Sequence, residues 1–244
     1  MAHSSLKRQT ANDVSFRYSV IIPSYNEESF LPETLAKLKL AMQDIPHQGE
    51  IIVVDNNSTD RTAEIAQANG TRVVFEPERQ ISRARNSGAG AAKSDWLIFL
   101  DADTILSASL LNNALTHLKN GTCCGGGTLL DFDTQLPFLA GRLVSFWNWL
   151  SRTRKLAAGS FIFCLREAFI DTGGFDEKTY AGEEVFFSRK LQRWGKKHDL
   201  PFIILADQHV VTSSRKFHWY SSMQITGLLL MFTVFPFALR SRTL

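Results

Sequence analysis

Residues 96–103 (WLIFLDAD) form an uninterrupted apolar run that ends in two carboxylates one residue apart. Such a run predicts a strand that is buried on both faces, as in the centre of a parallel sheet. Open α/β sheets bind ligands at the carboxyl ends of their strands, so we expect Asp101 and Asp103 to face a site. Carboxylate oxygens suit Mg²⁺ or Mn²⁺, especially where substrate phosphates complete the coordination. The run therefore predicts a metal-bridged diphosphate; the alternative is a turn in which Asp103 or Thr104 caps the next helix.

The composition limits the class of protein. The chain has 244 residues, of which 44% are hydrophobic, and this is enough for one large core. A formal net charge of +3 gives no basis for nucleic-acid binding, which usually shows a concentrated basic face. Cys123, Cys124 and Cys164 lack metal-ligand spacing and are expected to be reduced thiols of a cytoplasmic protein. Residues 1–17 are polar, without the apolar region of a signal peptide, and are expected to form a flexible tail.

The chain alternates between short apolar runs and longer amphipathic stretches. Strands are expected at residues 19–23, 50–55, 71–75 and 96–100. Helices are expected at residues 28–42, from a cap at Ser58 or Thr59 through residue 68, at residues 82–92 and at residues 108–119. This alternation predicts an α/β fold with a parallel sheet and right-handed crossovers. Residues 18–218 are expected to form one domain, with an apolar extension at residues 219–244.

Six short motifs follow one another along the chain. They are VIIPSYNE (residues 20–27), IVVDNNSTD (52–60), RARN (83–86), DAD (101–103), GGFD (173–176) and GEE (182–184). In this order, over about residues 18–200, the chain resembles the family 2 glycosyltransferases of the GT-A fold. The resemblance implies a Rossmann-like, mostly parallel central sheet flanked by helices. It also implies a nucleotide-diphosphate sugar donor, Mn²⁺ or Mg²⁺ as cofactor, and inverting transfer to an acceptor hydroxyl.

The ends of the first two expected strands carry the candidate nucleotide-binding residues. The resemblance implies that Pro23, Tyr25 and Glu27 form the floor of the nucleotide pocket, largely through backbone groups, and that Glu27 binds the ribose or the base. Glu27 also suits a helix entry, where a carboxylate is favourable. Asp55 either starts an Asx turn or serves as a ligand group. The resemblance implies that it accepts a hydrogen bond from the nucleobase.

Arg83 and Arg85 lie two residues apart, so on a helix they point to different sides. One of them is expected to reach the nucleotide or the diphosphate, and the family pattern favours Arg85. The other is expected to lie on a solvated face. Asn86 and Gly88 are expected to serve close packing of the helix on the sheet.

In the metal site, the resemblance implies that Asp103 ligates the cation directly and that Asp101 lies nearer the ribose or a metal-bound water. A third ligand in GT-A enzymes is often a histidine from the C-terminal part. His209, which follows an apolar run, is a better candidate than His218, although a histidine beside a strand can equally be structural. Arg215 is expected to contact the diphosphate; a basic surface turn is the alternative.

The acidic pair Glu183 and Glu184 opens an expected helix. Family members usually carry Glu-Asp at this place, and their second acid acts as the general base. The resemblance therefore assigns the base to Glu184, whose arm is one methylene longer than in the family pattern. Because catalytic placement is tight, the choice between Glu183 and Glu184 stays open. Both residues also suit the dipole at the start of a helix.

Two apolar segments bear on the acceptor. In residues 137–155 the apolar members are Leu139, Leu143, Phe146, Trp147 and Leu150, and the basic members are Arg152, Arg154 and Lys155. This pattern is typical of a membrane-interface helix and equally of an amphipathic core helix. Residues 225–239 are apolar but shorter than the roughly 20 residues that span a bilayer, which favours an interfacial anchor or an oligomer contact. Together the segments predict a lipid-linked or membrane-proximal acceptor and a protein that is peripheral at the inner face of the membrane.

Two other classes share parts of this pattern. A sugar nucleotidyltransferase shares the sheet and the metal chemistry, and the glycines at residues 125–127 resemble its glycine-rich loop. That loop belongs after the first strand, however, where this chain has residues 23–26. A non-catalytic nucleotide-sugar-binding protein is the second alternative, and it would be favoured if neither Glu183 nor Glu184 faced the cleft.

Overall fold

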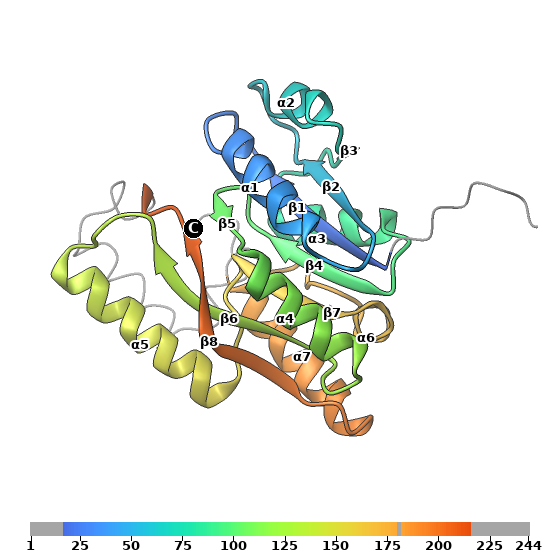
Figure 1. Ribbon diagram of the computed structural model, residues 1–244, viewed down its shortest axis with the longest axis vertical. Helices are drawn as coiled ribbons and strands as arrows, with labels where there is room; N and C mark the ends of the chain where they lie inside the picture. Colours follow the sequence, from blue (N-terminus) through green and yellow to red (C-terminus); the bar gives the residue numbers. More distant parts are fainter. Residues whose placement is uncertain (1–16, 180–181, 216–244) are drawn as a thin grey trace, which may run out of the picture.

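The structure, a computed structural model, describes residues 17–179 and 182–215 (Figure 1). The four predicted strands are present, with bounds that differ from the prediction by at most one residue. They are β1 (Tyr18–Ser24), β2 (Gly49–Asp55), β3 (Arg72–Phe75) and β4 (Trp96–Leu100). The described residues do not include residues 1–16 of the expected tail. They also do not include His218 or the expected extension at residues 219–244.

One eight-stranded sheet runs through the described part of the chain, in the order β3-β2-β1-β4-β7-β6-β8-β5. The first four strands in this order are parallel, as the strand–helix alternation predicts. The other four are β5 (Thr104–Ile105), β6 (Gly125–Phe132), β7 (Phe161–Leu165) and β8 (Phe202–Thr212). Strand β7 runs antiparallel to both β4 and β6, while β8 is parallel to β6 and antiparallel to β5. The sheet is therefore parallel on one side and mixed on the other.

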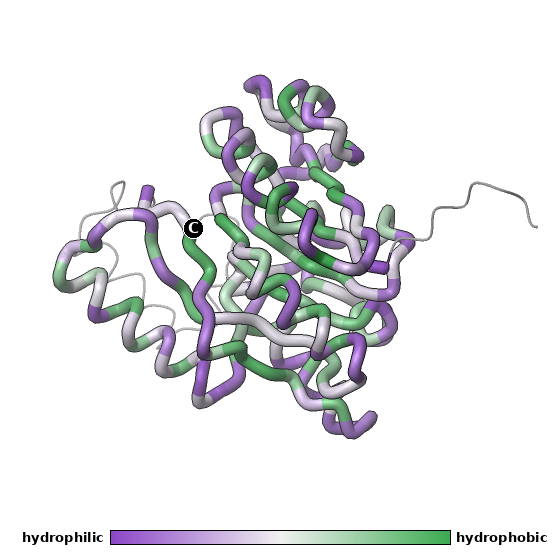
Figure 2. Tube along the Cα trace, in the orientation of Figure 1, coloured by the Kyte–Doolittle hydropathy of each residue, from purple (hydrophilic) through white to green (hydrophobic). Residues whose placement is uncertain are grey.

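Helices cover both faces of the sheet. On one face lie α1 (Leu31–Gln43), α2 (Thr62–Ala68) and α4 (Ala108–Lys119), which share a core cluster with every second residue of β1, such as Val20 and Ile22. On the other lie α3 (Ile81–Ala91), α6 (Arg166–Asp171) and α7 (Glu183–Lys197), whose core cluster includes Ile21. The central strands are correspondingly apolar along their length (Figure 2). This three-layer arrangement confirms the predicted α/β class.

Two helices begin later than predicted because the loops before them bind each other. Helix α1 starts at Leu31 instead of residue 28. Neither Ser58 nor Thr59 caps α2; the hydroxyl of Ser58 accepts a hydrogen bond from the Asn26 N–H (3.1 Å), and the Thr59 N–H donates to Asn26 Oδ1 (2.8 Å). The polar residues after β2 therefore brace the loop after β1 at the carboxyl edge of the sheet.

The start of α4 differs from the alternative in which Asp103 or Thr104 caps this helix. Ser107 caps this helix by accepting a hydrogen bond from the Leu110 N–H (3.2 Å). Thr104 instead begins β5 and pairs with β8. Neither Asp103 nor Thr104 is therefore used as a helix cap, and both carboxylates after β4 keep their side chains for other contacts.

The glycines at residues 125–127 lie inside β6, between β7 and β8. A Cβ atom at Gly125 would come within 2.5 Å of the Phe163 carbonyl, and one at Gly126 within 2.4 Å of the Ile203 carbonyl. Close strand packing therefore explains these glycines, and the resemblance to a phosphate-binding loop has no structural basis. Cys123, Cys124 and Cys164 are buried and unpaired beside this strand, and burial raises the pKa of each thiol.

Helix α5 (Phe138–Arg154) lies at one end of the molecule, beside β6 and β8 (left in Figure 1). It coincides with the amphipathic segment that the sequence places at residues 137–155. Within residues 17–179 and 182–215, no helix has the length and apolar character needed to cross a bilayer. The apolar segment at residues 225–239 lies outside the described residues.

Candidate active site

A cavity of about 620 Å³ opens at the carboxyl ends of the parallel strands. The loop after β1 contributes Pro23, Tyr25 and Glu27, and the end of β4 contributes Asp101 and Asp103. Arg215, which follows β8, closes one side. Because the carboxyl ends of parallel strands meet at one edge of the sheet, residues far apart in sequence converge here. The structure thus brings together six of the predicted site residues.

Arg215 joins two of these carboxylates. Its guanidinium lies 3.1 Å from Asp103 Oδ2 and donates a hydrogen bond to Glu27 Oε1. Burial opposes the charge on Arg215, but its hydrogen bond to Glu27 and the charge of Asp103 outweigh burial and raise its pKa. The Ser213 N–H also donates to the Asp103 carbonyl (3.1 Å), so the loop after β8 is fixed against the end of β4. Arg215 is therefore part of the cavity wall and not an ordinary surface turn.

Arg85 occupies a different place from Arg83. Arg85 is 1% exposed and does not line the cavity. Its Nη2 donates hydrogen bonds to Asp101 Oδ1 (3.0 Å) and to the Gly159 carbonyl (3.1 Å). Its Nη1 donates a hydrogen bond to Glu183 Oε1 (2.6 Å). Burial opposes this charge, but Asp101 and Glu183 outweigh it and raise the pKa of Arg85. Arg83 is partly exposed and pairs with Glu76 and Glu177. The arginine that the family pattern favours is thus a buried brace behind the site.

The two acids at the start of α7 have unequal environments. Glu183 is 5% exposed and its carboxylate is held by Arg85. Glu184 is only half-buried, and no side-chain hydrogen bond to it is recorded among the described residues. Burial, and after it the charge of Glu183, raise the pKa of Glu184 to about 8, while Arg85 lowers it in part. Neither glutamate lines the cavity of about 620 Å³, and Glu184 is the one whose raised pKa lies near neutral pH.

Other predicted residues serve the surroundings of the cavity. Asp55 is buried, and its Oδ1 accepts a hydrogen bond from the Ser58 N–H (3.0 Å), the contact expected of a turn. Gly88 approaches β1 and β2 so closely that a Cβ atom would lie 2.4 Å from Ile21 Cγ2, which agrees with a packing role. Asn86 does not pack on the sheet; its amide donates to the Phe175 carbonyl and accepts from the Phe175 N–H, both at 3.0 Å.

His209 is not brought to the acidic cavity. It lies on β8 opposite Leu129 and lines a separate hollow of about 430 Å³ between β6 and α5. Across residues 17–179 and 182–215, no three His, Cys, Asp or Glu side chains form a metal-binding group. The candidate ligands are therefore Asp101 and Asp103 alone, an open oxygen-only pair.

The charges around this pair favour a cation. Four carboxylates, those of Glu27, Asp101, Asp103 and Glu183, share two guanidinium groups, those of Arg85 and Arg215. An uncompensated group of buried carboxylates is costly without further positive charge. Hard divalent ions such as Mg²⁺ and Mn²⁺ take oxygen ligands and accept substrate phosphates as the remaining ones. The donor set thus fits a divalent cation held jointly by the protein and a phosphorylated ligand.

The residues that line the cavity without having been predicted include Asn56, Arg79 and Gln80. Asn56 donates to the carbonyls of Glu76 and Glu78 and accepts from the Gln80 N–H, which joins the loops after β2 and β3. The guanidinium of Arg79 lies 4.9 Å from the centre of the Tyr25 ring at the cavity wall. Their positions in the sequence could have indicated them, because polar residues that follow a parallel strand lie at the same edge of the sheet as Asp101.

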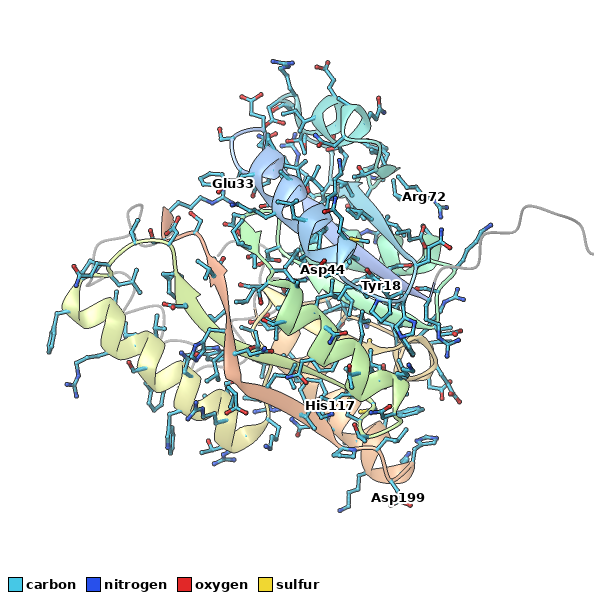
Figure 3. The ribbon with its side chains drawn as sticks, in the orientation of Figure 1. Tyr18, Glu33, Asp44, Arg72, His117 and Asp199 are labelled. Atoms are coloured by element: carbon cyan, nitrogen blue, oxygen red, sulfur yellow. The ribbon has the colours of Figure 1, made fainter. Side chains whose placement is uncertain are left out.

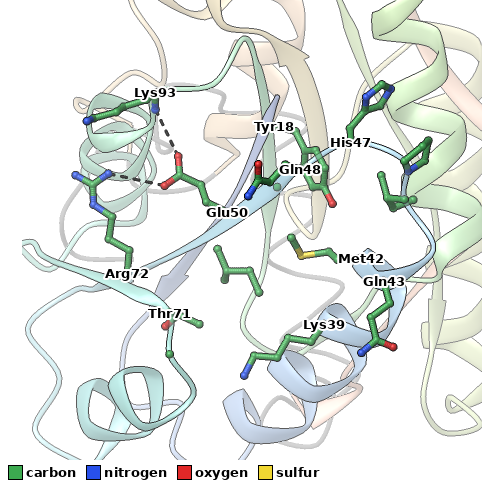
Figure 4. Close-up of a pocket in the computed structure, with 15 residues that line it drawn as sticks. Tyr18, Lys39, Met42, Gln43, His47, Gln48, Glu50, Thr71, Arg72 and Lys93 are labelled. Carbon is green, nitrogen blue, oxygen red and sulfur yellow. Dashed lines mark hydrogen bonds and ion pairs between the residues drawn. The ribbon is translucent and has the colours of Figure 1, made fainter. Parts of the chain in front are cut away.

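A larger hollow, of about 990 Å³, lies at the opposite end of the same strands. Tyr18 and Arg72, labelled in Figure 3, belong to it, and Figure 4 shows its lining close up. Glu50 is the single carboxylate in this lining, together with Lys39, Arg72 and Lys93. The smaller cavity is the candidate active site because the carboxylates converge there, although its volume is the lower of the two.

Comparison with known proteins gives the class of this chain. The family model described as Glycosyl transferase family 2 matches residues 19–170. An uncharacterized glycosyltransferase of Mycobacterium tuberculosis is 31% identical over 181 residues, which cover 72% of this chain and 80% of that relative. The chain therefore belongs to glycosyl transferase family 2 and is a glycosyltransferase.

Other similarities are more local or concern the fold. An undecaprenyl-phosphate 4-deoxy-4-formamido-L-arabinose transferase of Pseudomonas fluorescens is 39% identical over 93 residues, which are 35% of this chain and 27% of that protein. A mannosyltransferase from Pyrobaculum calidifontis, solved with GDP-Man and Mn²⁺, superposes with a TM-score of 0.65 at 22% identity, over 82% of this chain and 57% of that one. Glucosyl-3-phosphoglycerate synthase from Mycobacterium tuberculosis, solved with Mn²⁺ and UDP, gives a TM-score of 0.58 at 19% identity, over 88% and 79%. These structures confirm the GT-A fold.

Proposed function

We propose that this glycosyltransferase moves a sugar from a nucleotide-diphosphate sugar to an acceptor hydroxyl, with inversion at the anomeric carbon and with Mn²⁺ or Mg²⁺ as cofactor. One observation carries the proposal: Asp101 and Asp103 line the cavity at the carboxyl ends of the strands, and buried Arg85 links Asp101 to the acidic pair that opens α7. A diphosphate site and a candidate base are thereby held in one connected group.

Within this group, Glu184 is the general base. Glu183 is not the base, because its carboxylate already accepts a hydrogen bond from Arg85 (2.6 Å). Glu184 has a raised pKa, which makes it a stronger base once it has lost its proton. Its carboxylate takes the proton from the acceptor hydroxyl as that oxygen attacks the anomeric carbon from the side opposite the leaving diphosphate. A positioned base contributes about 10²–10⁴-fold to the rate.

The leaving diphosphate is held from the opposite side. Asp103 and Asp101 would hold the divalent cation, which supplies positive charge to the leaving group when it is bound. Arg215, fixed by Asp103 and Glu27, adds a guanidinium at the same wall of the cavity. Pro23, Tyr25 and Glu27 form the floor against which the nucleoside lies. Asp55, at the tip of β2, supports this floor from behind, because its carboxylate is buried and accepts a hydrogen bond from the Ser58 N–H.

A lipid-linked acceptor is part of the proposal. The Pseudomonas fluorescens relative is named for an undecaprenyl-phosphate acceptor, and its similarity covers 35% of this chain. An acceptor of this kind would be presented at a membrane, with the protein peripheral at its inner face. The mannosyltransferase and synthase structures support a nucleotide-linked donor and Mn²⁺ through shared fold alone.

A ligand screen tests this function. Thermal unfolding would be followed with UDP, GDP and their sugar conjugates, each with and without Mn²⁺. We expect one nucleotide diphosphate to raise the melting temperature only when the divalent cation is present. Stabilisation by none of them, or equal stabilisation without the cation, would contradict the donor class or the metal dependence, respectively. Transfer from the stabilising donor would then be followed to a lipid-linked acceptor that carries a free sugar hydroxyl, with the anomeric configuration of the product read by NMR.

A further inference from the structure

Helix α5 presents two different faces. Leu143, Trp147 and Leu150, which belong to the apolar face predicted from sequence, are partly buried against the body of the protein. The most exposed aromatic side chains are Phe138, which is 81% exposed, Trp149, which is 58% exposed, and Phe146 of the predicted face, which is 56% exposed. Three residues of the face expected to meet a membrane are thus turned inward, while Phe146 lies with Phe138 and Trp149 on the solvent side.

The exposed aromatic residues lie on one side of α5. At about 100° per residue, Phe138, Arg142, Phe146 and Trp149 fall within an arc of about 80°; we call these four residues the outer face. The rings of Phe146 and Trp149 stack with centroids 5.8 Å apart, and the guanidinium of Arg142 lies 5.8 Å from the centre of the Phe138 ring. Three large apolar side chains in one exposed patch are typical of a surface that binds a partner.

The charge of the helix identifies the kind of partner. Within Phe138–Arg154 there is no acidic residue, and Arg142, Arg152 and Arg154 are exposed. A helix with Phe and Trp on one side and flanking arginines is suited to the boundary between lipid headgroups and acyl chains, where the rings insert and the arginines meet anionic phosphates. A protein partner would have to offer an acidic and apolar groove together, whereas an anionic bilayer offers both everywhere.

Both ends of α5 are tied to the candidate active site. Before the helix, the Asp133 carboxylate accepts a hydrogen bond from the Ser214 N–H (2.9 Å), next to Arg215. After the helix, the Gly159 carbonyl accepts from Arg85 (3.1 Å) and the Ser160 carbonyl from the Asp101 N–H (3.3 Å). A surface that held α5 would therefore hold the cleft at a fixed position beside it.

We propose that the outer face of α5 docks on an anionic membrane surface, with Phe138, Phe146 and Trp149 inserted at the headgroup level, and that this docking places the cleft beside membrane-borne acceptors. The acceptor clause rests on the proposed function; the docking itself does not. The occupant is the bilayer surface, and the chemistry that recognises it is aromatic insertion plus phosphate binding by arginine.

Vesicle flotation of the full chain tests the docking without donor or acceptor. Vesicles would consist of phosphatidylcholine alone or of phosphatidylcholine with phosphatidylglycerol. We expect binding to the anionic vesicles, weaker binding to the neutral ones, and a loss at high salt. The Asp103→Asn variant should bind vesicles like the unchanged protein, so a failure of docking and a failure of the proposed chemistry are distinguishable.

Two sets of variants address the outer face. Phe146→Ser with Trp149→Ser should lower the partition onto anionic vesicles by about ten-fold or more, because both inserted rings are lost. Arg142→Glu keeps the aromatic residues of the outer face and should reduce the preference for anionic vesicles. Leu40→Ser and Ile170→Ser, at positions that are 58% and 60% exposed outside α5, are the matched controls and should bind normally. Melting temperatures and nucleotide binding verify that each variant is folded.

Three results would overturn the proposal. The first is absence of binding to either kind of vesicle. The second is equal binding by the outer-face variants and their matched controls. The third is a loss of binding only when residues 216–244 are removed, with the α5 variants unaffected, since that would assign the membrane contact to the C-terminal segment.

Discussion

Strands β1 and β2 connect two hollows that differ in charge more than in size. At their amino ends, the hollow of about 990 Å³ is lined by Lys39, Arg72 and Glu50, and Figure 4 shows Glu50 paired with Arg72. Lys39 donates to the Asn69 carbonyl (2.6 Å), Arg72 to the Ala91 carbonyl (2.8 Å), and Glu50 accepts from Ser19 (2.6 Å). At their carboxyl ends, the cavity of about 620 Å³ belongs to a group in which carboxylates outnumber arginines.

This difference sets a candidate reactive end of the sheet apart from the opposite end. Loops that leave parallel strands converge at the carboxyl edge. More carboxylates can therefore lie there than nearby cationic side chains can neutralise. At the amino edge, Lys39, Arg72 and Glu50 each contact a backbone carbonyl or a side chain nearby. Perturbed groups with unbalanced charge are typical of functional sites. Substitutions at the two ends should therefore have unequal consequences.

The largest effect is expected for Asp103→Asn. The amide removes a negative charge at which a divalent cation would be held, so cation-dependent nucleotide binding should be lost and turnover should fall by about 10³-fold or more. Calorimetric titration of a nucleoside diphosphate with and without Mn²⁺ measures the first effect. Asp44→Asn, at an exposed carboxylate after α1, is the matched control. Cation-dependent affinity that survives in Asp103→Asn would refute the ligand assignment.

The next effect concerns the base. Glu184→Gln should lower turnover by about 10²–10⁴-fold while nucleotide affinity stays within a few-fold, because the amide keeps the shape but cannot accept a proton. Glu184→Asp, which restores the family pattern, should retain most activity. A large loss of turnover in Glu183→Gln with full nucleotide binding, and none in Glu184→Gln, would transfer the role to Glu183. Steady-state kinetics with a fixed acceptor and a binding titration separate these cases.

Arg85 and Arg83 offer a comparison two residues apart on α3. Arg85→Met leaves the carboxylates of Asp101 and Glu183 buried without their partner and should cost about 3–5 kcal/mol of unfolding free energy. Arg83→Met breaks pairs in which the arginine side chain is 39% exposed and should cost less than about 1 kcal/mol. Urea denaturation of both variants measures the difference. Equal losses would show that burial of the Arg85 pairs does not matter.

The raised pKa of Glu184 also makes stability depend on pH. The folded state binds this proton more tightly than the unfolded state, so the stabilisation is complete below the ordinary carboxyl pKa and is lost as pH rises toward about 8. The Glu184→Gln variant has no carboxyl group at this position, so its stability does not fall in this way as pH rises. We expect it to be more stable than the unchanged protein near pH 8, by on the order of 1–3 kcal/mol, because half-burial leaves partial screening. Thermal unfolding of both proteins between pH 5 and about pH 8 tests this; parallel curves would contradict the assignment.

The smallest effect is expected at the amino end. Tyr18 is fully buried, and its hydroxyl has no hydrogen-bond partner among the described residues. Tyr18→Phe removes this unsatisfied group and should raise the unfolding free energy by about 1 kcal/mol, with nucleotide binding unchanged. A loss of nucleotide affinity in this variant would show that the two ends of the sheet are coupled, and a loss of stability would show that the hydroxyl has a partner in solution.

The sequence by itself determined the parallel half of the fold and the location of the site. Apolar runs and helical periodicity are local signals, and they place β4 and α4 at their observed bounds. The position of Asp101 and Asp103 after a buried strand then follows, because chain direction decides which edge of a parallel sheet receives the loops. The acidic pair at the start of α7 also lies where the motif order places it.

Only the tertiary structure decided the mixed half and the roles within the site. The antiparallel position of β7 between β4 and β6 arises from pairing between distant segments. Arg85 and Glu183 are 98 residues apart in the chain, so no local pattern separates a buried brace at Arg85 from an exposed arginine at Arg83. The same holds for His209 on β8 and for the face that α5 turns outward. Burial of a side chain depends on which neighbours the whole fold brings to it, and spacing along the chain does not contain that information.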